Sequence, residues 1–265
     1  MSAPSRSCVI VLAAPRSGSS WVASLLRSTG VLGVCREWLT AVVNSAAPNQ
    51  FPLPPTVAES NAAQADAFRA ALRATASTLN GVCAVKLLSS TFDRLPATLA
   101  RWGIGDGVSN AWMPELFERP VILVLRRRDL IGSAISWWRA LHTGEYARFD
   151  AASTITAWPT YDFPALQTAL RQTHAHVARF DEGLASLAAL SGAVCIDAIY
   201  EDMLVDPQPA VASIAVTVGV LIPTGSLATP LTVQRDTTTE AVREQFLRDL
   251  KSVHHLDAAA TQEAS

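Results

Sequence analysis

The chain places one arginine and three serines directly after an apolar run near its start. The run Cys8–Ala14 is followed by the segment Pro15, Arg16, Ser17, Gly18, Ser19 and Ser20, which we call the anion loop. A helical pattern begins at once, and unpaired N–H groups and the helix dipole favour an anion at such a strand-to-helix turn. The arginine adds a permanent charge, the serines add hydroxyl donors, and the glycine lets the backbone approach an oxyanion closely. We therefore predict that this loop binds a phosphate-like group.

A second basic segment, Arg126-Arg127-Arg128, follows the apolar run Pro120–Leu125 and precedes another helical pattern. Ser136 lies eight positions after Arg128. The arginine therefore stands at the start of the helix, and the serine stands about two turns along it. A forked guanidinium with one hydroxyl suits a terminal phosphate monoester. A solvated basic turn is the alternative interpretation of this segment.

Apolar runs alternate with helical patterns along the chain, which predicts a parallel β-sheet. The expected strands are Cys8–Ala14, Gly81–Leu88, Pro120–Leu125 and Ala193–Ile199. The expected helices are Ser19–Thr29, Ala58–Leu79, Ser90–Trp102 with an interruption at Pro96, Leu130–Leu141, Ala165–Leu190 and Pro207–Val218. This order indicates an α/β fold, a P-loop-like parallel sheet with helices on both faces. Its ligand sites should lie beyond the carboxyl ends of the strands, where the anion loop, Lys86 and the arginine segment fall.

Composition limits the classes of function. A length of 265 residues suits a single domain, residues 1–265, in which we expect residues 256–265 to fray. A formal net charge of −2 argues against a nonspecific nucleic-acid binder, which needs a basic surface to release counterions. The apolar runs are shorter than the roughly 20 residues that cross a bilayer, so we predict no membrane span. We expect a cytoplasmic protein, because removing the first apolar run as a signal peptide would destroy the anion loop.

The four cysteines, Cys8, Cys35, Cys83 and Cys195, follow no metal-binding spacing. We interpret them as reduced and mostly buried thiols, and we predict no metal site. Cys35 lies beside Arg36, and a neighbouring positive charge lowers the pKa of a thiol. No general base stands near it in the sequence, so a nucleophilic role is disfavoured.

The two basic motifs resemble those of the sulfotransferase superfamily that uses 3′-phosphoadenosine-5′-phosphosulfate (PAPS). The segment from Pro15 to Trp21 is similar to that family's 5′-phosphosulfate loop, which usually reads Pro-Lys-Ser-Gly-Thr-Thr-Trp, and Arg128 with Ser136 is similar to its 3′-phosphate motif. Further details resemble the trehalose sulfotransferase branch. They are Arg16 in place of lysine, Thr29-Gly30 followed by Glu37, Val85-Lys86, and Ser136-Trp-Trp-Arg-Ala140 before Thr143-Gly144. The segment Tyr200-Glu201-Asp202 before Pro207 is also similar to the family. The resemblance covers about Ser7–Gly219 and implies the sulfotransferase fold.

The resemblance also implies the roles of the motif residues in sulfuryl transfer, where positioning and charge stabilisation dominate catalysis. Arg16 would stabilise the bridging oxygen of the leaving nucleotide, and Ser17–Ser20 would hold the 5′-phosphate. Arg128 and Ser136 would bind the 3′-phosphate and so select this donor over ATP. The product would be adenosine 3′,5′-bisphosphate (PAP), and no metal is required.

Three further residues have less specific expected roles. Trp21 would stack on adenine, as an aromatic residue does in related enzymes, with core packing as the alternative. Lys86 would touch the sulfuryl group or the substrate, or it extends its ammonium from the strand end into solvent. Arg235 precedes the last helix, where relatives sometimes place another basic contact to the nucleotide.

The acceptor hydroxyl needs a base, and two residues are candidates. Glu37 lies at the position of the trehalose branch's proposed catalytic glutamate, and a carboxylate can serve as the base if burial raises its pKa toward neutrality. Cys35-Arg36 replaces the Pro and His that more often precede this glutamate, and a surface ion pair with Arg36 is the alternative. His142 is the second candidate, because many other sulfotransferases use histidine and because His142 follows the predicted helix that contains Ser136.

The expected acceptor is a small molecule, sugar or secondary metabolite with a hydroxyl group. The segments expected to meet it are rich in aromatic residues, namely Trp38, Phe51, Trp112, Trp158, Tyr161 and Phe163. An apolar or aromatic acceptor fits them at least as well as trehalose does. Members of the branch are often dimers, so a homodimer is also expected.

Two other functions stay open at this point. One is a P-loop-type small-molecule kinase, although the Walker spacing G-x-x-x-x-G-K-[ST] with its lysine and metal-binding hydroxyl does not occur in the sequence. The other is a non-catalytic nucleotide-binding module that retains both phosphate sites without a working base. Turnover with ATP and magnesium would favour the first, and tight PAP binding without transfer would favour the second.

Overall fold

The computed structural model describes residues 7–43, 62–146, 158–225, 227–229, 231 and 236–263. The chain forms two compact units, each with its own hydrophobic core. Unit 1 contains residues 1–128 and 176–230, and unit 2 contains residues 129–175 and 231–265. The interpretation of residues 1–265 as one domain stays a prediction.

Four parallel strands form the sheet of unit 1 in the order β2-β1-β3-β4. They are β1 (Ser7–Ala13), β2 (Cys83–Leu88), β3 (Arg119–Arg126) and β4 (Val194–Ile199), all within two residues of the predicted bounds. β1 is buried along its whole length because both faces of the sheet are covered, which explains why its sequence is a continuous apolar run. The predicted α/β fold with a parallel sheet is confirmed.

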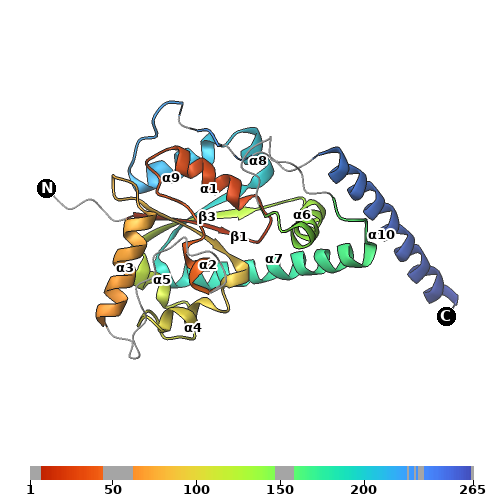
Figure 1. Cartoon of the computed structure of the whole chain (residues 1–265), viewed down its shortest axis with the longest axis horizontal. Coiled ribbons are helices and arrows are strands. Elements are labelled where there is room, and N and C mark those ends of the chain that lie inside the picture. The colour runs from red at the N-terminus through yellow and green to blue at the C-terminus, as the bar shows by residue number, and fades with distance from the viewer. Residues whose placement is uncertain are drawn as a thin grey trace. The chain divides into compact units, whose positions relative to one another are not determined.

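Helices cover both faces of this sheet, as the sequence predicts (Figure 1). The helices on one face are α1 (Ser19–Ser28), α8 (Tyr200–Val205) and α9 (Gln208–Val218). Those on the other face are α2 (Trp38–Val43), α3 (Ala62–Ala76), α4 (Leu95–Ala100), α5 (Trp112–Leu116) and the second half of α7 (Phe163–Ser191). Successive residues of a strand point to opposite faces, so Val9 and Val11 pack with the first group and Ile10 and Leu12 with the second.

The segment Ser90–Trp102 differs from its prediction. A short 3-10 turn, η1 (Ser89–Thr91), comes first, and α4 begins only at Leu95. Pro96 occupies the first turn of α4, where its missing N–H leaves no intrahelical hydrogen bond unmade. The proline therefore helps to start a helix that we expected it to interrupt.

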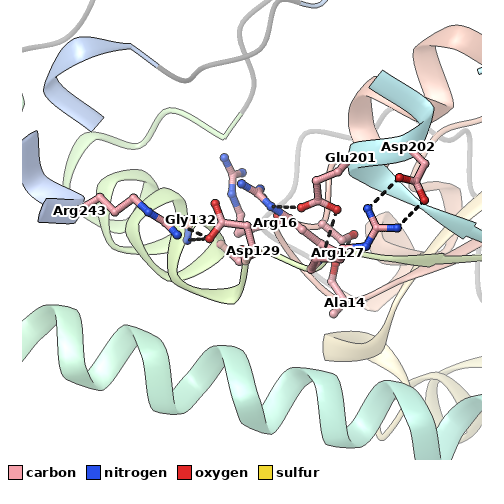
Figure 2. Close-up of polar contacts among 11 residues, drawn as sticks. Ala14, Arg16, Arg127, Asp129, Gly132, Glu201, Asp202 and Arg243 are labelled. Carbon is pink, nitrogen blue, oxygen red and sulfur yellow. Dashed lines mark hydrogen bonds and ion pairs between the residues drawn. The ribbon is translucent and has the colours of Figure 1, made fainter. Parts of the chain in front are cut away.

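Unit 2 contains α6 (Leu130–Thr143), the first part of α7, and α10 (Thr237–Glu263), which includes most of the tail that we expect to fray. Asp129 caps α6 by accepting a hydrogen bond from the Gly132 N–H at 2.9 Å. Arg243 of α10 donates to the same carboxylate oxygen at 2.6 Å, which ties α10 to the start of α6 (Figure 2). Within the described ranges, no helix combines the length and the apolar character needed to cross a membrane.

Candidate active site

The anion loop and the arginine segment meet at the carboxyl edge of the unit 1 sheet. β1 and β3 are neighbours, and the chain continues from β1 to β2 on one side and from β3 to β4 on the other. The loops that follow β1 and β3 therefore diverge at a topological switch point, where open α/β sheets bind ligands. A hydrogen bond of 2.8 Å from Arg127 Nη1 to the Arg16 carbonyl oxygen joins the two segments. Their predicted proximity is confirmed.

The anion loop contains two left-handed backbone conformations. The φ angle is 63° at Arg16 and 86° at Gly18, and α1 begins at Ser19. Such a conformation costs a non-glycine residue about 1–2 kcal/mol, so surrounding contacts must stabilise it at Arg16. The Ser17 hydroxyl donates to the Ala14 carbonyl at 2.7 Å and tightens the turn from within. Among the described residues no side chain caps α1, so its first N–H groups are not satisfied by a side chain.

Tyr200 packs so closely against the anion loop that only glycine fits at position 18. A Cβ at Gly18 would lie less than 3.0 Å from three carbons of the Tyr200 ring, closer than Cβ atoms come to their neighbours. The positive φ angle at this position independently favours glycine. Gly18 is thus required by the packing of the protein as well as by the backbone conformation of the loop.

The three consecutive arginines have three different partners. Those partners are Asp181 for Arg126, the Arg16 carbonyl for Arg127 and Asp202 for Arg128. The last pair is bidentate, because the two Nη atoms of Arg128 lie 2.7 and 2.6 Å from the two Asp202 oxygens (Figure 2). These hydrogen bonds raise the pKa of Arg128 and lower the pKa of Asp202. Both side chains are 60% exposed, so the guanidinium fork of Arg128 is accessible from solvent.

Glu37 is connected to the anion loop through Lys86. The Lys86 N–H donates to the Arg36 carbonyl at 2.8 Å, which holds the chain before Glu37 against β2. Lys86 Nζ lies 2.5 Å from Glu37 Oε1 and 2.9 Å from Ser20 Oγ. The Lys86 side chain is 6% exposed and that of Glu37 is 36% exposed, so the ammonium is covered while the carboxylate can be reached. The candidate base, a buried lysine and the predicted phosphate site therefore form one continuous line of polar contacts.

The pairing of Glu37 with Lys86 is not apparent from the sequence. Forty-nine positions separate the two residues, and no local pattern links them. A signal was nevertheless present, because a lysine inside the apolar run Cys83–Leu88 is a buried charge that needs an anionic partner. Arg36, whose ion pair with Glu37 was the alternative interpretation, lies over the Trp38 ring, with 5.7 Å between its Cζ and the ring centroid.

The other predicted site residues lie in different surroundings. Trp21 is half-buried, with its ring edge-on to Tyr200 at a centroid distance of 6.2 Å. Ser136 and His142 both lie on α6 in unit 2. Nδ1 of the exposed His142 lies 2.8 Å from the Trp138 carbonyl; since a carbonyl only accepts, Nδ1 donates and Nε2 is the nitrogen that can take a proton. Arg235 lies outside the described residues.

The aromatic residues expected to meet the acceptor are mostly core residues. Trp112 is fully buried and Trp38 is 4% exposed, and both pack in the core beside the sheet. Trp158, Tyr161 and Phe163 pack against the core of unit 2, and Phe51 lies outside the described residues. The prediction that Trp38 and Trp112 line an acceptor site is therefore wrong, because tertiary packing removes both rings from the surface.

The prediction of a lowered pKa at Cys35 is also wrong. Burial raises the pKa of this thiol to about 12, although Lys86 and Arg27 act in the opposite direction. Desolvation outweighs these charges because the side chain is completely covered. Cys8 and Cys83 are buried as expected, whereas Cys195 is exposed.

These exposures predict how the thiols react. When the folded protein is treated briefly with iodoacetamide at pH 8, we expect one alkyl group per chain, located at Cys195, because access limits the other three thiols. Mass spectrometry of the intact chain and of its peptides measures this, with all four sites alkylated in guanidinium chloride as the control. Rapid alkylation of Cys35 in the folded protein would contradict the structure.

Comparisons with known proteins identify the family of this chain. A sequence model of the Stf0 sulphotransferase family matches residues 8–248. The chain belongs to the Stf0 sulphotransferase family. The resemblance inferred from the sequence motifs is thereby confirmed, and the matched residues of this Stf0 family member include the anion loop, Glu37, Lys86 and the arginine segment.

Two trehalose 2-sulfotransferases are similar to this Stf0 family member. The one from Mycobacterium tuberculosis is 29% identical over 153 residues, which are 51% of this chain and 57% of the relative. The one from Mycolicibacterium smegmatis is 28% identical over 154 residues, with the same two coverages of 51% and 57%. The match thus spans little more than half the length of these curated relatives.

Two solved structures superpose on this Stf0 family member. A sulfotransferase from Alicyclobacillus acidocaldarius superposes with a TM-score of 0.45 at 13% identity, over 95% of this chain and 96% of the other. The sulfotransferase domain from the curacin biosynthetic pathway superposes with a TM-score of 0.42 at 16% identity, over 88% and 79%. The α/β fold of unit 1 is defined by its own strand order and by the helices on both faces of its sheet.

Proposed function

We propose that this chain transfers the sulfuryl group of PAPS to a hydroxyl group of a small-molecule acceptor. The observation that carries the proposal is the line of contacts Glu37–Lys86–Ser20, which leads from an accessible carboxylate to the anion loop. Membership of the Stf0 family supports the same reaction class. The arrangement brings a base and an anion site together without using any group from unit 2.

The anion loop fits the 5′ end of the donor. Its backbone is left-handed at Arg16 and Gly18, and α1 begins directly after Gly18. The loop also contains Arg16, the arginine that the family motif assigns to the leaving group. The N–H groups of Ser17–Ser20 would hold the 5′-phosphate, since the Ser17 hydroxyl is already bonded to Ala14. Arg16 would stabilise the charge that develops on the bridging oxygen, which is where a fixed cation lowers the barrier most.

Glu37 is the proposed base. The donor supplies an activated sulfuryl group attached to a good leaving phosphate. As the acceptor oxygen forms its bond to sulfur, the bond between sulfur and the bridging oxygen breaks, and PAP leaves with that electron pair. The acceptor proton passes to the Glu37 carboxylate. Lys86 holds that carboxylate in place through the ion pair between its Nζ and Glu37 Oε1.

Arg128 is the proposed ligand of the 3′-phosphate. Its exposed fork already holds the two oxygens of Asp202 in the geometry that two phosphate oxygens would take. Binding of the 3′-phosphate would displace or share this carboxylate, at little cost because both side chains are largely solvated. Ser136 as a second ligand and Arg235 as a further basic contact remain proposals from the sequence motifs.

The acceptor class includes sugars. Two relatives are by name trehalose 2-sulfotransferases, and the loss of Trp38 and Trp112 to the core removes part of the case for an aromatic acceptor. We propose a carbohydrate or another polyhydroxylated small molecule. Transfer from 35S-labelled PAPS to a panel of disaccharides, monosaccharides and phenols tests this. Magnesium-dependent ATP turnover without any sulfate transfer would overturn the proposed function in favour of a kinase.

The Arg128 assignment predicts a change in nucleotide selectivity. In Arg128→Ala we expect PAP to bind about tenfold more weakly, because hydrogen bonds to a charged group are lost, while binding of adenosine 5′-phosphate changes by less than about twofold. Calorimetric titration of both nucleotides measures the two dissociation constants. Arg73→Ala is the matched control, since Arg73 is also a partly exposed arginine of unit 1 with a carboxylate partner, Glu118 at 3.1 Å. Equal weakening of both nucleotides in Arg128→Ala would refute the assignment.

A further inference from the structure

We infer that Arg127 is a positioning residue that holds the anion loop in its phosphate-binding conformation. This inference rests on the proposed function, because it assumes that the anion loop receives the 5′-phosphate. Arg127 is the middle residue of a basic segment, yet its side chain is only 17% exposed. Its contacts are with the protein, so its charge acts on the loop and not directly on the donor.

Three contacts fix the Arg127 guanidinium within unit 1. Nη1 donates to the Arg16 carbonyl at 2.8 Å, and Nε lies 3.8 Å from Glu201 Oε1 (Figure 2). The flat face lies over the Tyr200 ring, with 5.4 Å between Cζ and the ring centroid. A planar guanidinium can make a hydrogen bond, an ion pair and a stacking contact at once, which an ammonium cannot.

The carbonyl that Arg127 holds belongs to the one described non-glycine residue with a positive φ angle, Arg16 at 63°. Without a partner for this carbonyl, the peptide would relax toward more stable backbone conformations. The Arg16 C=O and the Ser17 N–H are antiparallel across one trans peptide. Holding the carbonyl therefore also fixes the direction of the Ser17 N–H, one of the donors proposed for the 5′-phosphate.

Tyr200 and Glu201 extend this support to both anion sites. The same Tyr200 ring that stacks with Arg127 also closes the space above Gly18, so it touches the second left-handed residue of the loop. Glu201 Oε2 accepts a hydrogen bond of 3.1 Å from the Arg128 N–H. One pair of residues after β4 thus braces the anion loop through Arg127 and positions the backbone of the proposed 3′-phosphate ligand.

The test compares nucleotides that carry only one of the two phosphates. In Arg127→Met we expect adenosine 5′-phosphate and PAP to bind about tenfold more weakly and by the same factor, because the loop loses its brace. We expect binding of adenosine 3′-phosphate to change by less than about twofold, because Arg128 remains. Arg127→Lys should weaken the binding of both nucleotides less than Arg127→Met does. The lysine ammonium can still donate to the Arg16 carbonyl, although it lacks the planar fork of a guanidinium. Arg73→Met is the control for removing a paired arginine elsewhere in unit 1.

The outcomes separate this inference from the proposed function. If the wild-type chain binds neither PAP nor adenosine 5′-phosphate, the proposed function fails and the inference fails with it. If the wild type binds both and Arg127→Met weakens adenosine 3′-phosphate as much as adenosine 5′-phosphate, Arg127 has only a general structural role and the inference is wrong. Unchanged binding of adenosine 5′-phosphate in Arg127→Met also overturns it. If Arg127→Met does not fold by circular dichroism, the same selectivity measured in Arg127→Lys decides.

Discussion

Replacing Glu37 with glutamine is expected to lower kcat for sulfuryl transfer by about 10²–10⁴-fold, the usual contribution of a general base. Glutamine keeps an oxygen that can accept from Lys86 Nζ, so the buried ammonium retains a partner and the fold should persist. It cannot take a proton from the acceptor hydroxyl. PAP binding should therefore be retained while turnover falls, which steady-state kinetics and calorimetry measure together.

A second glutamate provides the control for this experiment. Glu118 also pairs with a basic side chain in unit 1, Arg73 at 3.1 Å, and it is 54% exposed. Glu118→Gln should leave kcat unchanged, which shows that loss of one carboxylate charge is not sufficient. If Glu37→Gln keeps full activity and His142→Ala abolishes it, the base is the histidine.

The second large effect is expected for Gly18→Ala. The new Cβ would overlap the Tyr200 ring, and the positive φ angle disfavours alanine, so either the ring or the loop must shift. We expect the free energy of unfolding to fall by at least about 2 kcal/mol. Because misplacement of a substrate by about 1 Å can cost 10²-fold in rate, kcat/KM for PAPS should fall by about 10²-fold. Urea unfolding and donor-dependent kinetics test the two effects.

Gly30→Ala separates the steric effect from backbone strain. Gly30 has a similar φ angle of 69°, yet no atom of the described residues lies within 4 Å of the position that its Cβ would take. We expect a loss of about 1 kcal/mol in stability from the left-handed backbone and no change in PAP binding. A Gly18→Ala variant with the same mild phenotype would mean that the Tyr200 ring moves freely and that the loop does not depend on it.

The strand-to-helix turn could be predicted because it depends on residues adjacent in the chain. The buried run before Pro15, the loop residues and the helix that starts at Ser19 are all visible as local pattern. The alternation of strands and helices then brings the carboxyl ends of parallel strands to one edge. The meeting of the anion loop with Arg127 followed from that order alone.

Partners across the sheet could not be predicted from local pattern. Arg36 is next to Glu37 in the sequence but lies over Trp38, whereas Lys86 is remote in sequence and forms the ion pair. The spacing to Ser136 distinguished Arg128 from its neighbours, but the different partners of Arg126 and Arg127 became known only from the structure. Distances between side chains depend on strand register and helix packing, which a one-dimensional pattern does not encode.

The sequence by itself determined the fold class, the anion loop and the family resemblance, because hydrophobic periodicity and short motifs are local properties. Only the tertiary structure decided which charges are paired and which side chains are covered. Cys35 shows the physical reason. The positive charges around it lower the pKa of its thiol, but complete burial raises that pKa by more than the charges lower it. Desolvation is a property of the folded surroundings, and it decides the chemistry of a side chain only after the chain has packed.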